Sequence, residues 1–276
     1  ASARVTSGKQ MLAASDNPAG AMQVMTSDSS LRALDQYRTN VQRAGSRISI
    51  EDDVLQQIGD LLTRAKELGV QQIGSTANQA TRATANAEVQ ELFKEIIALG
   101  NTKFGNEYMF GGDQSQTTPF SWNGVGATLD FTSTTPQGTR TVEIADGQTM
   151  SVALDGKALL LDSGVLDAVK ALSRALDPAS TTYGQDGIGA AMQNLDAAFD
   201  AVQSLVGDVG AKGKRIESTQ ANLDAYKTNL TTFKSSLQDI DLEQAVTELT
   251  NRQVAYQAAM LATTKVMGLT LTDYLR

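Results

Sequence analysis

Residues 188–240 read IGAAMQNLDAAFDAVQSLVGDVGAKGKRIESTQANLDAYKTNLTTFKSSLQDI and contain a seven-residue repeat of apolar side chains. A repeat of this period places one stripe of a long helix against a partner helix. At a rise of 1.5 Å per residue, such a helix would be about 80 Å long. The repeat is carried by Ile188, Leu195, Val202, Val209, Ile216, Leu223, Leu230 and Leu237.

We call this stripe the seam of the helix, and a second set of apolar side chains accompanies it. Its members follow the heptad positions by four residues in the first half of the stretch and by three residues in the second half. This difference predicts one change of phase near residues 210–214. The accompanying residues are Met192, Phe199, Val206, Tyr226, Phe233 and Ile240.

The N-terminal part of the chain carries a matching seam, which predicts a helix over residues 31–66. Glu51 interrupts the seam and indicates either a local polar contact or an offset register. Further upstream, Asn17 followed by Pro18 is typical of a helix N-terminus, with Asn17 as the cap. The seam consists of Leu34, Val41, Ile48, Leu55 and Leu62.

Further helices are predicted after residue 77, where apolar spacing leads to Leu99, and over residues 165–176. Between residues 104 and 160, glycine and threonine become frequent and strand-like alternation replaces the helical period. Asp146-Gly147 is predicted to be a hairpin turn and Asp155-Gly156 a further turn.

The predicted fold is therefore mainly α with an inserted small β domain. Its N- and C-terminal arms form a long antiparallel helical bundle or coiled-coil rod. We divide the chain into an N-terminal helical arm (1–103), the β domain (104–160), a C-terminal arm packed on the N-terminal arm (161–240) and a terminal assembly helix (241–276).

The last segment has an apolar seam that extends further than the N-terminal seam expected to pack against it. Residues 251–272 contain only two charges, Arg252 and Lys265. Burial within the same molecule is one interpretation, but contact with neighbouring copies fits better because little of the chain remains to cover the helix. The predicted subunit interface is Leu242, Val246, Leu249, Tyr256, Met260 and Met267.

Composition excludes several function classes. The sequence has no histidine and no cysteine, so ordinary zinc sites, histidine-based triads, thiol nucleophiles and disulfides are ruled out. We expect no enzymatic activity, no metal and no cofactor. A net charge of -8 disfavours nucleic acid. The apolar stretch 253–264, at 12 residues, is too short for membrane insertion, and residues 1–11 lack the pattern of a cleavable secretory signal.

Aromatic residues gather where the helical arm enters the predicted β domain. They could form the core of that small domain or a platform on which a ligand stacks, and we favour the core. These residues are Phe104, Tyr108, Phe110, Phe120 and Trp122.

Several short segments resemble the flagellin family. TSGK at residues 6–9 with SDNPA at 15–19 is similar to the family's "SGK...SDDPA" segment, and residues 209–218 resemble the opening of its C-terminal helix. Within the family, NEYMFGG at 106–112 leading to TTPF at 117–120 resembles the "YLFGG...PPF" passage of the hook-filament junction members. The ending LTLTDYL at 269–275 is similar to their "LLDYL".

This resemblance spans essentially the whole chain and implies a structural protein of the bacterial flagellum. It implies secretion through the flagellar type III export apparatus and assembly at the hook-filament junction. The implied partners are neighbouring copies, another hook-associated protein, flagellin, and an export chaperone on the C-terminal arm. Family members usually carry an apolar heptad helix ahead of the SGK segment, so we expect this sequence to be either a truncated chain or a trimmed mature form.

Two alternatives stay open at the level of the sequence. One is a filament flagellin with a short outer domain. The other, from a different functional class, is a surface carbohydrate-binding homologue that uses the aromatics around Trp122.

Overall fold

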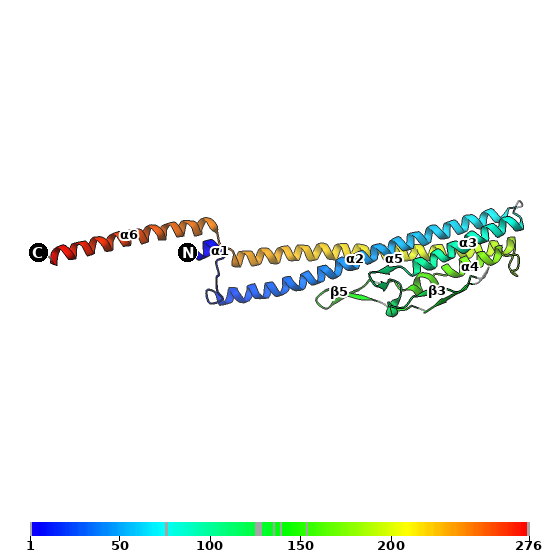
Figure 1. The fold of residues 1–276 in the computed structure, drawn as a ribbon, viewed down its shortest axis with the longest axis horizontal. Coiled ribbons are helices and arrows are strands. Elements are labelled where there is room, and N and C mark those ends of the chain that lie inside the picture. Colours follow the sequence, from blue (N-terminus) through cyan, green and yellow to red (C-terminus); the bar gives the residue numbers. More distant parts are fainter. Residues whose placement is uncertain are drawn as a thin grey trace. The chain divides into compact units, whose positions relative to one another are not determined.

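The computed structural model describes residues 2–74, 77–124, 129–134, 136–138, 140–152 and 154–274, with side chains as far as Lys265. It divides into two compact units, 1–36 with 223–276 and 37–222, which we describe separately. Helices dominate, and the strands are confined to one inserted region (Figure 1). The predicted class, mainly α with a small β insert, is confirmed. The two units cut across our four predicted segments.

Two long helices contribute to both units: α2 (Pro18–Ile73) and α5 (Gln185–Gln238). Within unit 37–222 they pack antiparallel, because Gly45 lies against Ile216, whereas Lys66, further along α2, pairs with Asp196 at an earlier position of α5. Every heptad side chain from Ile188 to Ile216 is buried, as the seven-residue period predicts.

The predicted change of phase in α5 is wrong. Tyr226 and Phe233 are 55% and 48% exposed, so they do not belong to the seam. The position four residues after each heptad residue continues to face inward, and Lys227 and Lys234 occupy it. Their aliphatic stems lie along the seam while their ammonium groups reach carboxylates of α2 in the same unit, Lys227 Nζ lying 2.6 Å from Asp35 Oδ1 and Lys234 pairing with Asp28.

The helix-start predictions are confirmed. α2 begins at Pro18, and the Gly20 amide donates to Asn17 Oδ1 over 3.0 Å. The third helix, α3, runs Gln79–Gly100 and begins with a reciprocal capping box between Asn78 and Thr81. The predicted helix 165–176 is α4 (Val165–Leu176). Two further helices, α1 (Ser2–Ser7) and α6 (Leu242–Tyr274), belong to the terminal unit.

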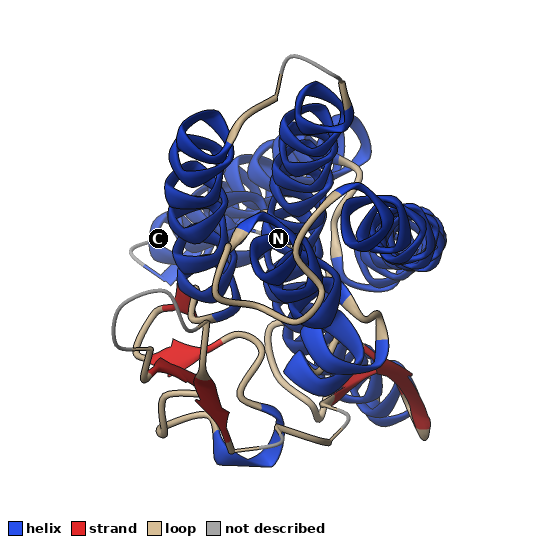
Figure 2. Cartoon of the chain, turned by 90° about the vertical axis from the view of Figure 1, so that its right-hand side faces the viewer, coloured by secondary structure: helices blue, strands red, loops and turns tan. Residues whose placement is uncertain are grey.

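The β insert lies between α3 and α4, and its described residues form three two-stranded antiparallel sheets. Within unit 37–222, the strands lie to one side of the long helices (Figure 2). The hairpin predicted around Asp146-Gly147 is confirmed, with Val142 opposite Met150. The sheets pair β1 (Lys103–Phe104) with β2 (Glu107–Tyr108), β3 (Phe120–Trp122) with β4 (Phe131–Ser133), and β5 (Thr141–Ala145) with β6 (Gln148–Ser151).

The segments after β2 and β6 contain short helices that the sequence analysis did not foresee. Gly112–Gln114 forms a 3-10 turn, labelled η1. Where a turn was predicted at Asp155-Gly156, a π-helix, η2 (Lys157–Asp162), begins, and the Ala158 amide donates to Asp155 Oδ1 over 2.7 Å.

Gly100 marks the closest approach between α3 and the insert. A Cβ at this position would lie 2.5 Å from Leu160 Cδ1 and 3.0 Å from Phe120 Cδ2. We therefore expect Gly100→Ala to lower the free energy of unfolding by about 1–3 kcal/mol through overpacking. Gly207, on the exposed side of α5 with open space around it, is the matched control. Gly207→Ala should raise that free energy by about 0.5–1 kcal/mol. Denaturant titration of both variants measures the difference, and effects of the same sign would contradict this packing.

Candidate assembly surface

The corner between α5 and α6 is built from local capping and from the N-terminal segment. Asp241 Oδ1 accepts from the amides of Glu243 and Gln244 at 3.0 and 3.2 Å, which starts α6. Gly8 and Gln10 hold the corner, because the Gly8 carbonyl accepts from the Ile240 amide over 3.1 Å and the Gln10 amide donates to Gln238 O over 2.8 Å. The end of the family-like TSGK segment and the residue after it are thus hydrogen-bonded to the corner through their backbone. The sequence did not indicate this role.

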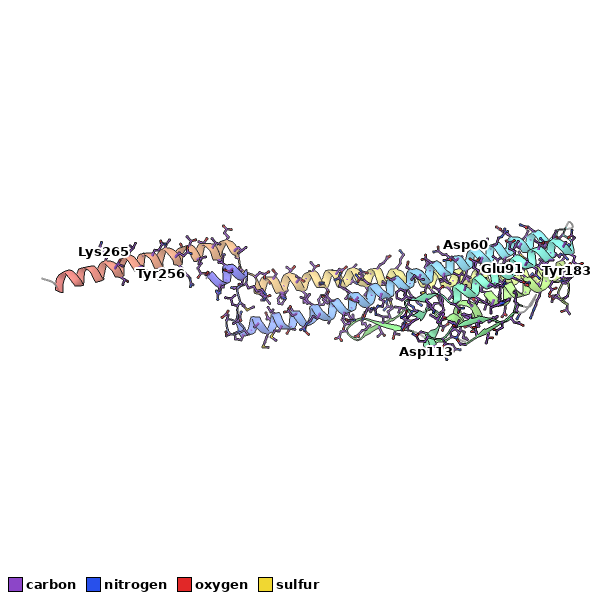
Figure 3. All side chains as sticks on the ribbon, in the orientation of Figure 1. Asp60, Glu91, Asp113, Tyr183, Tyr256 and Lys265 are labelled. Atoms are coloured by element: carbon purple, nitrogen blue, oxygen red, sulfur yellow. The ribbon has the colours of Figure 1, made fainter. Side chains whose placement is uncertain are left out.

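Beyond this corner, α6 has almost no cover from the described residues of its own unit. Ala245 is its one buried side chain among those described, and every side chain from Thr250 to Lys265 is exposed. Figure 3 shows Tyr256 and Lys265 projecting from the helix without a neighbouring element of the terminal unit beside them. A long helix with this many exposed apolar side chains is typical of a surface that another chain covers.

The residues predicted for the subunit interface lie along this helix. Tyr256 and Met260 are 68% and 52% exposed, Leu242 and Val246 are also exposed, and Leu249 is half-buried. The side chain of Met267 lies outside the described part of the chain.

The sequence analysis missed a second apolar stripe on the same helix. Val254 and Leu261 are exposed at 59% and 71% and are seven residues apart, so they share a face. Their seven-residue spacing is visible in the sequence, but the sequence analysis assigned only one apolar seam, that of residues 242–267, to this helix. With Val254 and Leu261, the apolar surface of α6 is wider than a single seam.

Glu51, the misfit of the N-terminal seam, is the centre of a buried polar contact in unit 37–222. It is fully buried, and its Oε1 lies 3.3 Å from Arg47 Nε and accepts from the Leu154 amide at 3.3 Å. Arg47 also donates through Nη2 to the Met109 carbonyl. Burial raises the pKa of Glu51, against the opposing effect of Arg47. The Arg47–Glu51 pair therefore ties α2 to two separate loops of the β insert.

The aromatic residues divide between core and surface. Phe110 and Phe120 are fully buried, whereas Phe104, Tyr108 and Trp122 are partly exposed. Their positions place the first two in the core of the insert.

The ring of Trp122 already has partners in its own chain. It meets Phe93 edge-on at 5.7 Å, and Lys94 Nζ lies 5.7 Å from its centroid. Both partners come from α3. This packing favours a core role for Trp122 over a stacking platform.

The NEYMFGG passage forms a turn that contains Met109, whose carbonyl accepts a hydrogen bond from Arg47. Gly112 has a φ of +56°, and a Cβ there would lie 2.2 Å from the Gln137 carbonyl oxygen. Only glycine fits this close approach, which allows the Asp113 amide to donate to Gln137 O over 2.9 Å. The preceding Met109 and Phe110 are buried. The passage is therefore a structural turn that anchors the insert.

Neither a metal-ion cluster nor a membrane-spanning helix is found among the described residues. Among them, no group of three carboxylate, imidazole or thiol side chains is arranged to hold a metal ion. No helix in the described part of the chain combines the length and apolarity that crossing a membrane requires.

Known proteins similar to this chain come from flagella. It is 26% identical to the flagellar filament 33 kDa core protein of Treponema phagedenis, over 94% of this chain and 85% of that protein. It is 25% identical to flagellar hook-associated protein 3 of Escherichia coli, over 97% of this chain and 90% of that protein. The solved structure of a putative flagellar hook-associated protein from Vibrio parahaemolyticus has the same fold, with a TM-score of 0.72, 15% identity, and coverage of 81% of this chain and all of that one.

Two family profiles match the chain and together cover most of its length. The bacterial flagellin N-terminal helical region matches residues 1–115, and the bacterial flagellin C-terminal helical region matches residues 192–275. The two matches contain the long helices α2 and α6 and all of α5 except its first seven residues. The chain therefore belongs to the bacterial flagellin family, whose members are structural, non-enzymatic components of the flagellum.

Proposed function

We propose that this protein is the subunit that joins hook to filament in the bacterial flagellum. The observation that carries the proposal is the uncovered helix α6, exposed over every side chain from Thr250 to Lys265. A helix of this kind is stabilised when neighbouring subunits bury it, as in a closed or helical assembly. In this proposal the interface consists of Leu242, Val246, Leu249, Tyr256, Met260 and Met267, extended by Val254 and Leu261.

The position at the junction is supported by two similarities. The alignment with hook-associated protein 3 of Escherichia coli extends over 90% of that protein, and the fold matches the putative hook-associated protein of Vibrio parahaemolyticus over its full length. The proposed neighbours are copies of this chain, another hook-associated protein on one side and flagellin on the other. An export chaperone would cover α6 before assembly, since the exposed apolar side chains would otherwise promote premature association.

A filament subunit is the second candidate, supported by the similarity to the Treponema phagedenis filament core protein. Deletion of the gene separates the two roles. A junction protein predicts cells with bare hooks that shed flagellin into the medium, because the filament has nothing to attach to. A filament subunit predicts bare hooks and no shed flagellin. Electron microscopy and analysis of the medium distinguish these outcomes, and cells with intact filaments would contradict both roles.

A further inference from the structure

A pocket of about 470 Å³ lies in unit 37–222 where α2 faces the β insert. Its α2 wall consists of Asn40, Arg43, Ala44 and Arg47, whose spacing of three and four residues places them on one face of the helix. The opposite wall comes from the β1–β2 hairpin and from the start of β5. The volume is within the range typical of sites for small molecules, roughly 300–1,000 Å³.

The charge of this pocket differs in sign from that of the whole protein. Arg43, Arg47 and Arg140 line it, and Glu107 is its one acidic lining residue among those described. Arg140 Nη1 lies 2.6 Å from Glu107 Oε2, and Arg47 is paired with the buried Glu51. In the described part of the chain, Arg43 has neither an ion pair nor a side-chain hydrogen bond. One positive charge in the pocket is therefore uncompensated, although the chain carries a net charge of -8.

Arg43 lies four residues before Arg47 on the same helix face, but Arg47 alone of the two pairs with Glu51 and donates to the Met109 carbonyl of the β insert. Like charges four residues apart destabilise a helix. A bound anion would remove this repulsion. The guanidinium groups of Arg43 and Arg140 present planar sets of donors that match a carboxylate.

The walls of the pocket are held in place without a ligand. Asn40 Nδ2 donates to the Glu143 carbonyl over 3.1 Å, which ties α2 to β5 at one side of the pocket. Arg47 donates to the Met109 carbonyl at the other side. Phe104 and Val142 add apolar surface beside these polar groups. A preformed pocket of this kind avoids the entropic cost of ordering its walls when a ligand binds.

We propose that this pocket binds a small organic acid, with its carboxylate held by Arg43 and Arg140 and its body against Phe104. The site is separate from α6 and does not depend on the role proposed for that helix. A concave pocket of this volume suits a dissolved small molecule better than the side chain of a flat protein partner.

The test uses a matched pair of probes, 4-fluorobenzoate and its neutral amide, 4-fluorobenzamide. Fluorine NMR linewidths of each probe, measured with the intact protein, should show the acid bound about tenfold more tightly, because it alone makes charge-assisted hydrogen bonds. The acid should also shift the side-chain Nε–H resonances of Arg43 and Arg140. Equal binding of acid and amide would overturn the proposal, as would unchanged arginine resonances.

A pair of variants assigns the effect to the pocket. Arg43→Gln should weaken binding of the acid about tenfold and leave the amide unaffected. Arg215→Gln, which removes an exposed arginine of α5 outside the pocket, should change neither. Equal losses in both variants would indicate general charge attraction and would overturn the site. The arginine resonances of the unmodified protein keep the test decisive if Arg43→Gln does not fold.

Discussion

Arg47→Met is expected to destabilise the protein by about 3–5 kcal/mol, the cost of leaving a buried charge without its partner. Glu51 is fully buried, and Arg47 is the basic side chain paired with it. The substitution also removes the donor to the Met109 carbonyl. Two connections between α2 and the β insert are thus weakened at once. Urea denaturation followed by far-UV circular dichroism measures the loss.

The pH dependence of this loss tests its cause. The pKa of Glu51 is raised from its ordinary value of 4.5 by burial, so the folded protein holds the proton more tightly than the unfolded chain. Its stabilising contribution is fully present below the unfolded value and is lost as pH rises through the raised folded value. Without Arg47, whose charge lowers this pKa, the folded value rises further. Arg47→Met should therefore cost more stability at pH 7 than at pH 4.

Two controls complete this prediction. Arg64→Met removes an exposed arginine of the same helix that pairs with Glu67 and Glu88, and it should have a much smaller effect. Adding Glu51→Leu to Arg47→Met should restore most of the lost stability, because no unpaired charge then stays buried. A loss in Arg47→Met that is independent of pH and not recovered in the double variant would show that packing, rather than charge, holds the insert.

Met260→Asp is expected to abolish polymerisation while leaving the isolated protein folded. Met260 is 52% exposed in the single chain, so the change in the free energy of unfolding should stay within about 0.5 kcal/mol. In an assembly that covers α6, the same carboxylate would be buried without a partner, which costs several kcal/mol per subunit, on the order of the loss expected for Arg47→Met. Sedimentation and electron microscopy of the purified protein measure assembly.

Asn251→Asp is the matched control for this experiment. Residue 251 is exposed and precedes Met260 by nine residues, which is about two and a half helical turns, so the two side chains point in opposite directions. The control adds the same charge to α6 away from the 242–267 seam, although beside Val254 of the second stripe, and should weaken assembly much less than Met260→Asp does. Full assembly of Met260→Asp would remove the proposed role of this face.

The sequence by itself determined the long helices and the class of the fold. The period of seven from Ile188 to Leu237 requires one continuous helix with a buried stripe, because no other backbone keeps such residues on one side. Asn17 with Pro18 determined where α2 begins, and Asp146 with Gly147 determined the β5–β6 turn. Each of these features depends on neighbours within a few residues, and local backbone geometry is set at that range.

Only the tertiary structure decided which side chains complete the seams and what the insert rests on. Tyr226 and Phe233 look apolar enough for the seam of α5, but Lys227 and Lys234 take the inward positions because Asp35 and Asp28 lie opposite them. Likewise, the burial of Glu51 in an apolar seam is explained by a hydrogen bond from the amide of Leu154, which lies 103 residues away in sequence. Periodicity reports the direction of a side chain on its own helix, whereas the choice between an apolar residue and a paired charge depends on a partner that folding brings from far along the chain.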